Sequence, residues 1–161
     1  MYHIYSSPLL TAIEHYKLDA IRLLLEHGAN PNLEAKTRLI FCKVSPIEYA
    51  TDLFCDIEII SLLLEYGAIA DARIVDAVVR NGTVDLLRLL LDHNANLDKR
   101  NIVQLAYDES KIDMLKLLLE YGAYPSISFR GSKGPYKEEM EALINQYQRS
   151  KRFNLMDEDV Y

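Results

Sequence analysis

The seven residues "LLLEYGA" occur twice in the chain, at 62–68 and at 117–123. A near copy, "LLLEHGA", stands at 23–29, and a fourth version, "LLLDHNA", stands at 89–95. The same order of apolar and polar residues extends upstream of each copy, giving "LDAIRLLLEHGA", "IEIISLLLEYGA", "VDLLRLLLDHNA" and "IDMLKLLLEYGA". Four copies of one pattern within 161 residues indicate a protein built from repeated structural units.

Each copy predicts a helix that is buried around most of its circumference. Apolar residues fill the first, third, fourth, sixth, seventh and eighth positions, which leaves a narrow polar strip such as Asp19, Arg22 and Glu26. Many helices end with one residue in the left-handed conformation, which glycine adopts without steric penalty and for which asparagine is the usual substitute. The predicted stop positions are Gly28, Gly67, Asn94 and Gly122.

A shorter helix is predicted in front of each of these. "SPLLTAIEHYK" at 7–17 and "SPIEYATDLFC" at 45–55 begin with Ser-Pro, a hydroxyl cap followed by a proline in the first turn. "RIVDAVVRNGT" at 73–83 and "RNIVQLAYDES" at 100–110 lack the proline but keep the small residues Ala77 and Ala106. Each unit is therefore predicted to be a helical hairpin.

These units resemble ankyrin repeats, whose pattern is Thr-Pro-Leu-His-x-Ala followed by a leucine-rich helix that ends in Gly-Ala. The resemblance covers residues 6–126 and implies an all-α ankyrin-repeat solenoid, with a β-hairpin finger between neighbours and a concave face that binds other proteins. We expect repeats at 6–32, 45–71, 72–98 and 99–126. The matching residues are Ser7, Pro8, Leu9 and Ala12, then Ser45, Pro46, Ile47 and Ala50, and the four helix endings.

The connectors depart from the family pattern. The four stop positions are 39, 27 and 28 residues apart, whereas ankyrin repeats are about 33 residues long. The second and third connectors are too short for a two-stranded finger, so we expect tight turns there. The first connector, 30–44, is long and carries the apolar run at 39–41. This run either folds back over the repeat pair and is buried, or anchors a partner.

A last helix is predicted at 136–148, where Met140, Leu143, Ile144 and Tyr147 share one face. An end repeat would otherwise expose an apolar surface, so this helix is expected to cap the stack within 127–150. The domain then spans 1–150. Residues 151–161 show no periodicity, and we expect a flexible tail, with a short recognition or export signal as the alternative.

Composition excludes several classes of function. The net charge is −6 and no basic cluster exceeds "RSKR" at 149–152, which argues against nucleic-acid binding. Cys42 and Cys55 form neither a disulfide framework nor a zinc pattern, as suits a reducing compartment. The start "MYHIYSSPLL" lacks the charged beginning and long apolar run of a signal peptide, and no stretch is long and apolar enough to predict a membrane span. We expect a monomer that is cytoplasmic or otherwise intracellular. Delivery into a host cell is one route by which it would reach that setting.

No pattern predicts an enzyme. The histidines, His3, His15, His27 and His93, are scattered along the chain, and two of them occupy the place before the stop residue that tyrosine fills elsewhere. There is no Ser-His-Asp order, glycine-rich phosphate loop or metal-ligand spacing. We therefore predict no catalytic residue, no metal and no cofactor.

The resemblance implies a module that binds another protein through exposed residues late in each first helix and at the connector tips. The acidic balance favours a basic partner surface. The second unit has one residue more than the first between its proline and its second helix, so a place in the core is the alternative for Phe54. The expected partner-binding residues are Glu14, His15, Leu53, Phe54, Arg80, Asn81, Asp108 and Glu109, with Phe41 and Phe129 in the long connectors.

Two narrower hypotheses stay open beside this one. The length suits an inhibitor that occludes an enzyme, as the small cyclin-dependent kinase inhibitors made of four or five ankyrin repeats do. The irregular repeats and the acid-bearing tail suit an effector of an intracellular bacterium or virus that acts on a host protein. The sequence does not name the partner.

Overall fold

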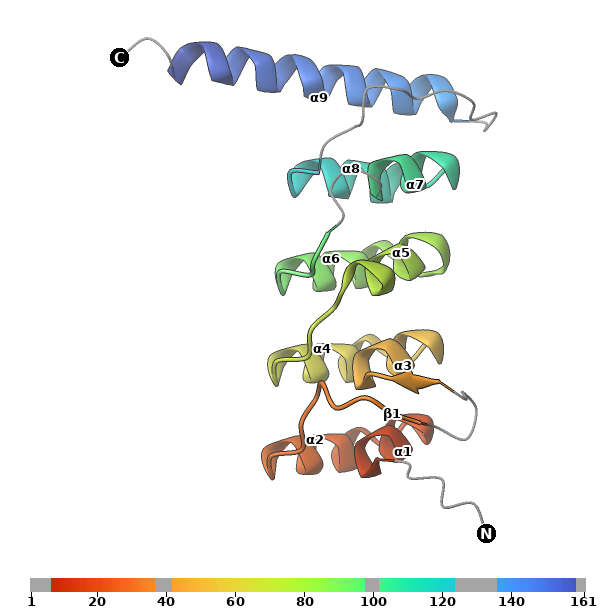
Figure 1. The fold of residues 1–161 in the computed structure, drawn as a ribbon. Coiled ribbons are helices and arrows are strands. Elements are labelled where there is room, and N and C mark those ends of the chain that lie inside the picture. Colours follow the sequence, from red (N-terminus) through yellow and green to blue (C-terminus); the bar gives the residue numbers. More distant parts are fainter. Residues whose placement is uncertain (1–6, 37–41, 98–101, 124–135, 159–161) are drawn as a thin grey trace.

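In the computed structural model, four helical hairpins stack as parallel tiers, with a longer helix lying across the last of them (Figure 1). The structure describes residues 7–36, 42–97, 102–123 and 136–158. The first helices of the hairpins form one layer and the second helices form another, and each contacts its counterpart in the next tier. The prediction of stacked helical hairpins is confirmed. The helices are α1 (Pro8–Glu14), α2 (Leu18–Glu26), α3 (Pro46–Asp52), α4 (Ile57–Glu65), α5 (Ala72–Asn81), α6 (Val84–Asp92), α7 (Ile102–Asp108), α8 (Ile112–Glu120) and α9 (Lys137–Glu158).

The second helices end as the sequence predicts. At the end of α2, the Gly28 amide donates to the carbonyl of Leu25 at 3.0 Å, and the Ala29 amide donates to the carbonyl of Leu24 at 2.9 Å. This pair of bonds satisfies carbonyls that a helix end otherwise leaves without partners. The same pair ends α4, α6 and α8. Asn94 takes the place of glycine at the end of α6, with φ +56°.

The two Ser-Pro starts differ in detail. Ser45 forms a capping box, in which its hydroxyl accepts from the Glu48 amide at 3.3 Å and its own amide donates to the Glu48 carboxylate at 3.4 Å. Ser7 holds the same position before α1, but its side chain accepts no bond from the first turn. The prediction of a hydroxyl cap is therefore confirmed for α3 and wrong for α1. Unlike α3, α1 has no glutamate in its first turn to complete the box.

The long first connector forms a short two-stranded finger. Strand β1 (Ala35–Lys36) pairs antiparallel with β2 (Lys43–Val44). The apolar run at 39–41 lies outside the described residues, so both interpretations of it stay open. The connector between α4 and α5 is short and contains no strand, as expected from its length. The third connector is described only to Leu97.

An asparagine side chain ties the first two tiers together. The Asn32 amide nitrogen donates to the carbonyl of Gly67 at 2.8 Å, and the backbone amide of Ile69 donates to the Asn32 side-chain oxygen at 2.8 Å. Asn32 lies at the start of the finger, and Gly67 and Ile69 follow the end of α4. These two hydrogen bonds therefore fix the spacing of two successive second helices, α2 and α4.

The core is continuous along the stack. Leucines at the same place in the second helices, such as Leu63, Leu90 and Leu118, are fully buried. Helix α9 covers the last tier, where Met140 and Ile144 are buried and the Tyr107 hydroxyl donates to Glu141 at 2.9 Å. Since these contacts close the apolar end of the stack, the capping helix is confirmed.

Helix α9 is longer than predicted. It continues to Glu158 and extends past the tiers (Figure 1), so 151–158 are helical although their sequence shows no periodicity; the flexibility of the tail stays a prediction. Residues 149–158 contain no glycine or proline and include good helix formers such as arginine, lysine, leucine, methionine and glutamate. A helix begun by the buried cap can therefore continue without an apolar stripe of its own.

Candidate functional site

The C-terminal ends of α1, α3, α5 and α7 form a row along the stack, which we call the helix-end row. The members are the two residues before the turn residue that follows each first helix, where the turn residues are Tyr16, Phe54, Gly82 and Ser110. These members are Glu14 and His15, Asp52 and Leu53, Arg80 and Asn81, and Asp108 and Glu109. Glu14 and Leu53 are partly buried and the other six are exposed. The row thus offers different side chains at four successive levels of one scaffold.

Three first helices end in a left-handed residue that is not glycine. Tyr16, Phe54 and Ser110 have φ of +53°, +51° and +56°. Each makes the same pair of backbone bonds that ends the second helices, for example from the Phe54 amide to the Thr51 carbonyl at 3.1 Å. Phe54 is therefore the counterpart of Tyr16 and Cys55 the counterpart of Lys17, so the extra residue of the second unit is Asp56.

This alignment shows which residues of the second tier are equivalent to Glu14 and His15, whereas the binding role of the predicted residues stays a prediction. The counterparts of Glu14 and His15 in the second tier are Asp52 and Leu53, one residue before the predicted pair of Leu53 and Phe54. Asp52 is exposed and Tyr16 is 50% exposed, and the sequence interpretation missed both. The signal was the one-residue difference between the first two units, which did not reveal where the extra residue lies.

Phe54 is not a core residue. Its side chain is 73% exposed, whereas Leu53 beside it is partly buried. A left-handed conformation costs a residue with a side chain roughly 1–2 kcal/mol. Such strain is found most often where the surrounding structure holds a residue for function. An exposed aromatic ring on strained backbone therefore marks this turn as a candidate contact.

Side-chain bonds join neighbouring levels of the row. The Arg80 guanidinium donates to Glu109 at 2.8 Å, linking the third tier to the fourth. The Tyr16 hydroxyl donates to the carbonyl of Leu53 at 3.0 Å, linking the first tier to the second. The other two predicted residues, Phe41 and Phe129, lie outside the described part of the chain.

Local bonds also orient two members of the row. His15 places Nδ1 2.9 Å from the Thr11 carbonyl, one turn back along α1. The Asp108 carboxylate accepts a bond of 2.8 Å from the Gln104 amide on the same helix. These contacts hold both side chains on the scaffold without burying them.

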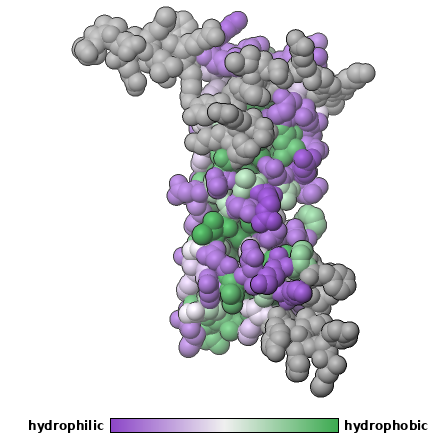
Figure 2. Space-filling view, in the orientation of Figure 1, coloured by the Kyte–Doolittle hydropathy of each residue, from purple (hydrophilic) through white to green (hydrophobic). Residues whose placement is uncertain are grey.

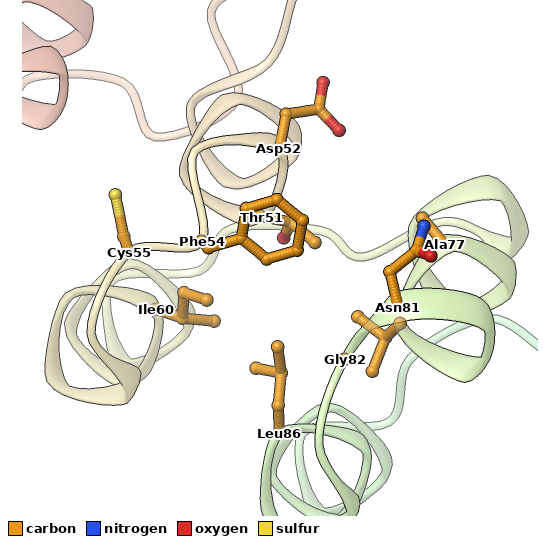
Figure 3. Close-up of a pocket in the computed structure, with 10 residues that line it drawn as sticks. Thr51, Asp52, Phe54, Cys55, Ile60, Ala77, Asn81, Gly82 and Leu86 are labelled. Atoms are coloured by element: carbon orange, nitrogen blue, oxygen red, sulfur yellow. The ribbon is translucent and has the colours of Figure 1, made fainter. Parts of the chain in front are cut away.

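A small pocket opens on this edge between the second and third tiers. Figure 3 shows Phe54 and Ile60 on one side and Asn81 and Leu86 on the other, with Asp52 at the rim. Its volume is about 90 Å³. Partial burial raises the pKa of Asp52 above its ordinary value. Burial, and to a smaller extent the charge of Asp56, raises the pKa of the Cys55 thiol to about 11.

The described residues show neither a metal site nor a membrane-spanning helix. Figure 2 shows a face that is largely hydrophilic, with separate apolar patches at several levels of the stack. Within the described residues, no group of three or more histidine, cysteine, aspartate or glutamate side chains is placed to hold a metal ion. None of the described helices is long and apolar enough to cross a membrane.

Comparisons with known proteins agree with this geometry. The family model described as "Ankyrin repeat" matches residues 5–36. A crystal structure of the ankyrin repeat domain of Bcl-3, described as a unique member of the IkappaB protein family, superimposes with a TM-score of 0.64. The match has 20% identity and covers 89% of this chain and 72% of that one. The chain therefore has the fold of an ankyrin repeat domain, and its first repeat matches the family model. No curated protein sequence matches it.

The ankyrin assignment fits the irregular units as well as the regular one. The sequence model matches the first unit and the start of its finger, which includes the start of α1 at Pro8 and the stop at Gly28. The structural match extends over most of the chain. The later ankyrin repeats therefore keep the fold although their connectors are shortened. Ankyrin domains are generally protein-binding modules.

Proposed function

We propose that this ankyrin domain binds another protein through the helix-end row and the finger, on the concave side of the stack. The observation that carries this proposal is the row itself, in which exposed side chains of varied charge and size recur at four levels. Its members rest on a core that is fully buried, so a partner would meet a preorganised surface. Recognition by such a scaffold needs no chemical step.

The proposal is of a binding protein without catalytic activity. The described histidines of the first repeat, His15 and His27, each hold a backbone carbonyl through Nδ1 at 2.9 and 2.8 Å. Arg73 is held by Asp71 at 2.9 Å and by Glu48 at 3.5 Å. These groups therefore serve the packing and capping of the repeats. Cys42 and Cys55 are free thiols, which suits the reducing, intracellular setting we propose.

The two narrower hypotheses concern the identity of the partner. An occluding inhibitor would bind an enzyme such as a kinase, and an effector would bind a protein of a host cell. Both would use the same surface, so identifying the partner and testing it for inhibited activity separates them.

Affinity capture with mass spectrometry tests the proposal. Asn81→Arg and Asp108→Arg alter two exposed members of the row, and Glu58→Lys alters an exposed residue of α4 in the other helix layer. We expect a partner of the unaltered domain to bind each row variant roughly tenfold more weakly or worse, since contacts at the centre of an interface dominate affinity. Glu58→Lys should retain binding. A partner that tolerates both row variants and is lost with Glu58→Lys would contradict the proposal.

A further inference from the structure

The pocket between the second and third repeats exists because two neighbouring repeats pack incompletely. Ala77 of α5 stands where α3 has Tyr49 and α7 has Leu105, so a small side chain faces the preceding tier. Leu86 is only partly buried, whereas its counterparts Ile59 and Met114 are buried. A fully packed interior would leave few spaces larger than a water molecule. The second and third repeats therefore leave room for a group from outside.

The walls and the rim of the pocket differ in polarity. Phe54, Ile60, Val78 and Leu86 make the walls largely apolar. Asp52 at the rim is partly desolvated, and among the described residues its carboxylate has no ion-pair partner. Arg80, near the end of α5, is already paired with Glu109. The free charge at the rim is therefore negative.

We infer that this pocket receives one aliphatic side chain of a partner protein, and that a lysine or arginine next to that side chain pairs with Asp52. The volume of about 90 Å³ decides the size of the group. Benzene occupies an engineered apolar cavity of about 150 Å³, so a small aliphatic group fills this pocket better than a whole aromatic ring. Charge complementarity indicates the neighbouring residue, because a lysine or arginine would pair with the Asp52 carboxylate, which has no ion-pair partner among the described residues. The inference rests on the proposed function and gives the chemistry of its partner.

Selection from a displayed library of random peptides on the whole domain tests this inference. Enriched peptides should share an aliphatic residue within two positions of a lysine or arginine. Ala77→Leu should weaken them roughly tenfold or more, because the added carbons fill the pocket without removing apolar surface. Asp52→Asn should weaken the same peptides by about three- to tenfold while leaving the shape of the pocket unchanged. Leu23→Ala, at an exposed leucine of α2, is the matched control and should change nothing.

The outcomes separate the pocket from the wider proposal. Amide chemical shifts on adding an enriched peptide should change at 51–55 and 77–82. Three outcomes would each overturn the inference. The enriched peptides could be rich in acidic residues, they could bind Asp52→Asn as well as the unaltered domain, or the changes in amide chemical shift could be confined to other repeats. If Ala77→Leu does not fold, Asp52→Asn alone decides the test, because it changes the charge without changing the shape of the pocket. A captured protein that is lost with Asn81→Arg and Asp108→Arg but tolerates Ala77→Leu and Asp52→Asn would keep the proposed function and reject the pocket.

Discussion

Replacing Phe54 by glycine should leave the stability of the domain nearly unchanged, although it removes a whole aromatic ring. Glycine adopts φ of +51° freely, so the change removes a strain of roughly 1–2 kcal/mol. Glycine has more conformational freedom in the unfolded chain, and this destabilises the folded state by roughly 0.5–1 kcal/mol, which offsets part of the gain. Full burial of a phenylalanine contributes about 1.5–3 kcal/mol, and a ring that is 73% exposed contributes only about a quarter of that.

These contributions nearly cancel, and we expect a change in unfolding free energy of about 1 kcal/mol or less in either direction. Urea denaturation followed by circular dichroism gives the value. A phenylalanine in a core loses about 3–5 kcal/mol on truncation. A loss in that range would refute both the exposed position of Phe54 and the assignment of strain to its backbone.

Two equivalent positions supply the controls. Tyr16→Gly relieves the same strain but also removes the hydrogen bond to the Leu53 carbonyl and a ring that is half-buried. It should therefore be about 1 kcal/mol less stable than Phe54→Gly, since a hydrogen bond contributes about 0.5–1.5 kcal/mol. Ser110→Gly relieves strain without removing a ring and should be neutral or stabilising. The reverse order of these variants would show that the left-handed turns are not strained.

Other parts of the stack give further tests. Leu63→Ala, at a fully buried position of α4, should lower the unfolding free energy by roughly 2–5 kcal/mol in urea denaturation, and an unchanged midpoint would contradict the register of the repeats. Removing residues 135–161 should uncover the last tier and cause aggregation, visible by light scattering, whereas removing only 151–161 should not; equal solubility would argue against the cap. Cys42 should react with a thiol reagent at pH 8 much faster than Cys55, because burial keeps the Cys55 thiol protonated, and equal rates would contradict its burial. Since the pKa of Cys55 is higher in the folded chain, stability should fall as the pH rises from about 9 through 11, and Cys55→Ser should reduce that slope.

The ends of the second helices could be predicted from sequence because their physical cause is local. A stop at Gly28 or Asn94 depends on whether one residue tolerates the left-handed conformation, and that depends on its own side chain. The stripe of Met140 and Ile144 is local in the same sense, since one face of one helix carries it. The extension of α9 to Glu158 was missed because periodicity detects burial, and a solvated helix needs none.

The candidate site was harder to predict, because it depends on how turns of unequal length are joined. The extra residue in the second repeat could be placed before or after Phe54, and the two choices put the ring in the core or in solvent. The structure places it after Phe54, at Asp56, which exposes the ring and brings Asp52 into the row. The pocket depends on Ala77 meeting the preceding repeat, a contact between residues far apart in the sequence that composition does not reveal.

Incomplete packing between the second and third repeats also bears on how the molecule opens. In a stack whose repeats contact only their neighbours, the weakest boundary decides which groups of repeats unfold together. Within both helix layers, contacts between neighbouring tiers are fewest between the second and third tiers. The Arg73–Glu48 ion pair and the bond from the Asn96 amide to the Ala70 carbonyl cross this boundary. The domain should therefore open locally as two cooperative units, α1–α4 and α5–α9. A molecule bound at that boundary would stabilise the contact between them.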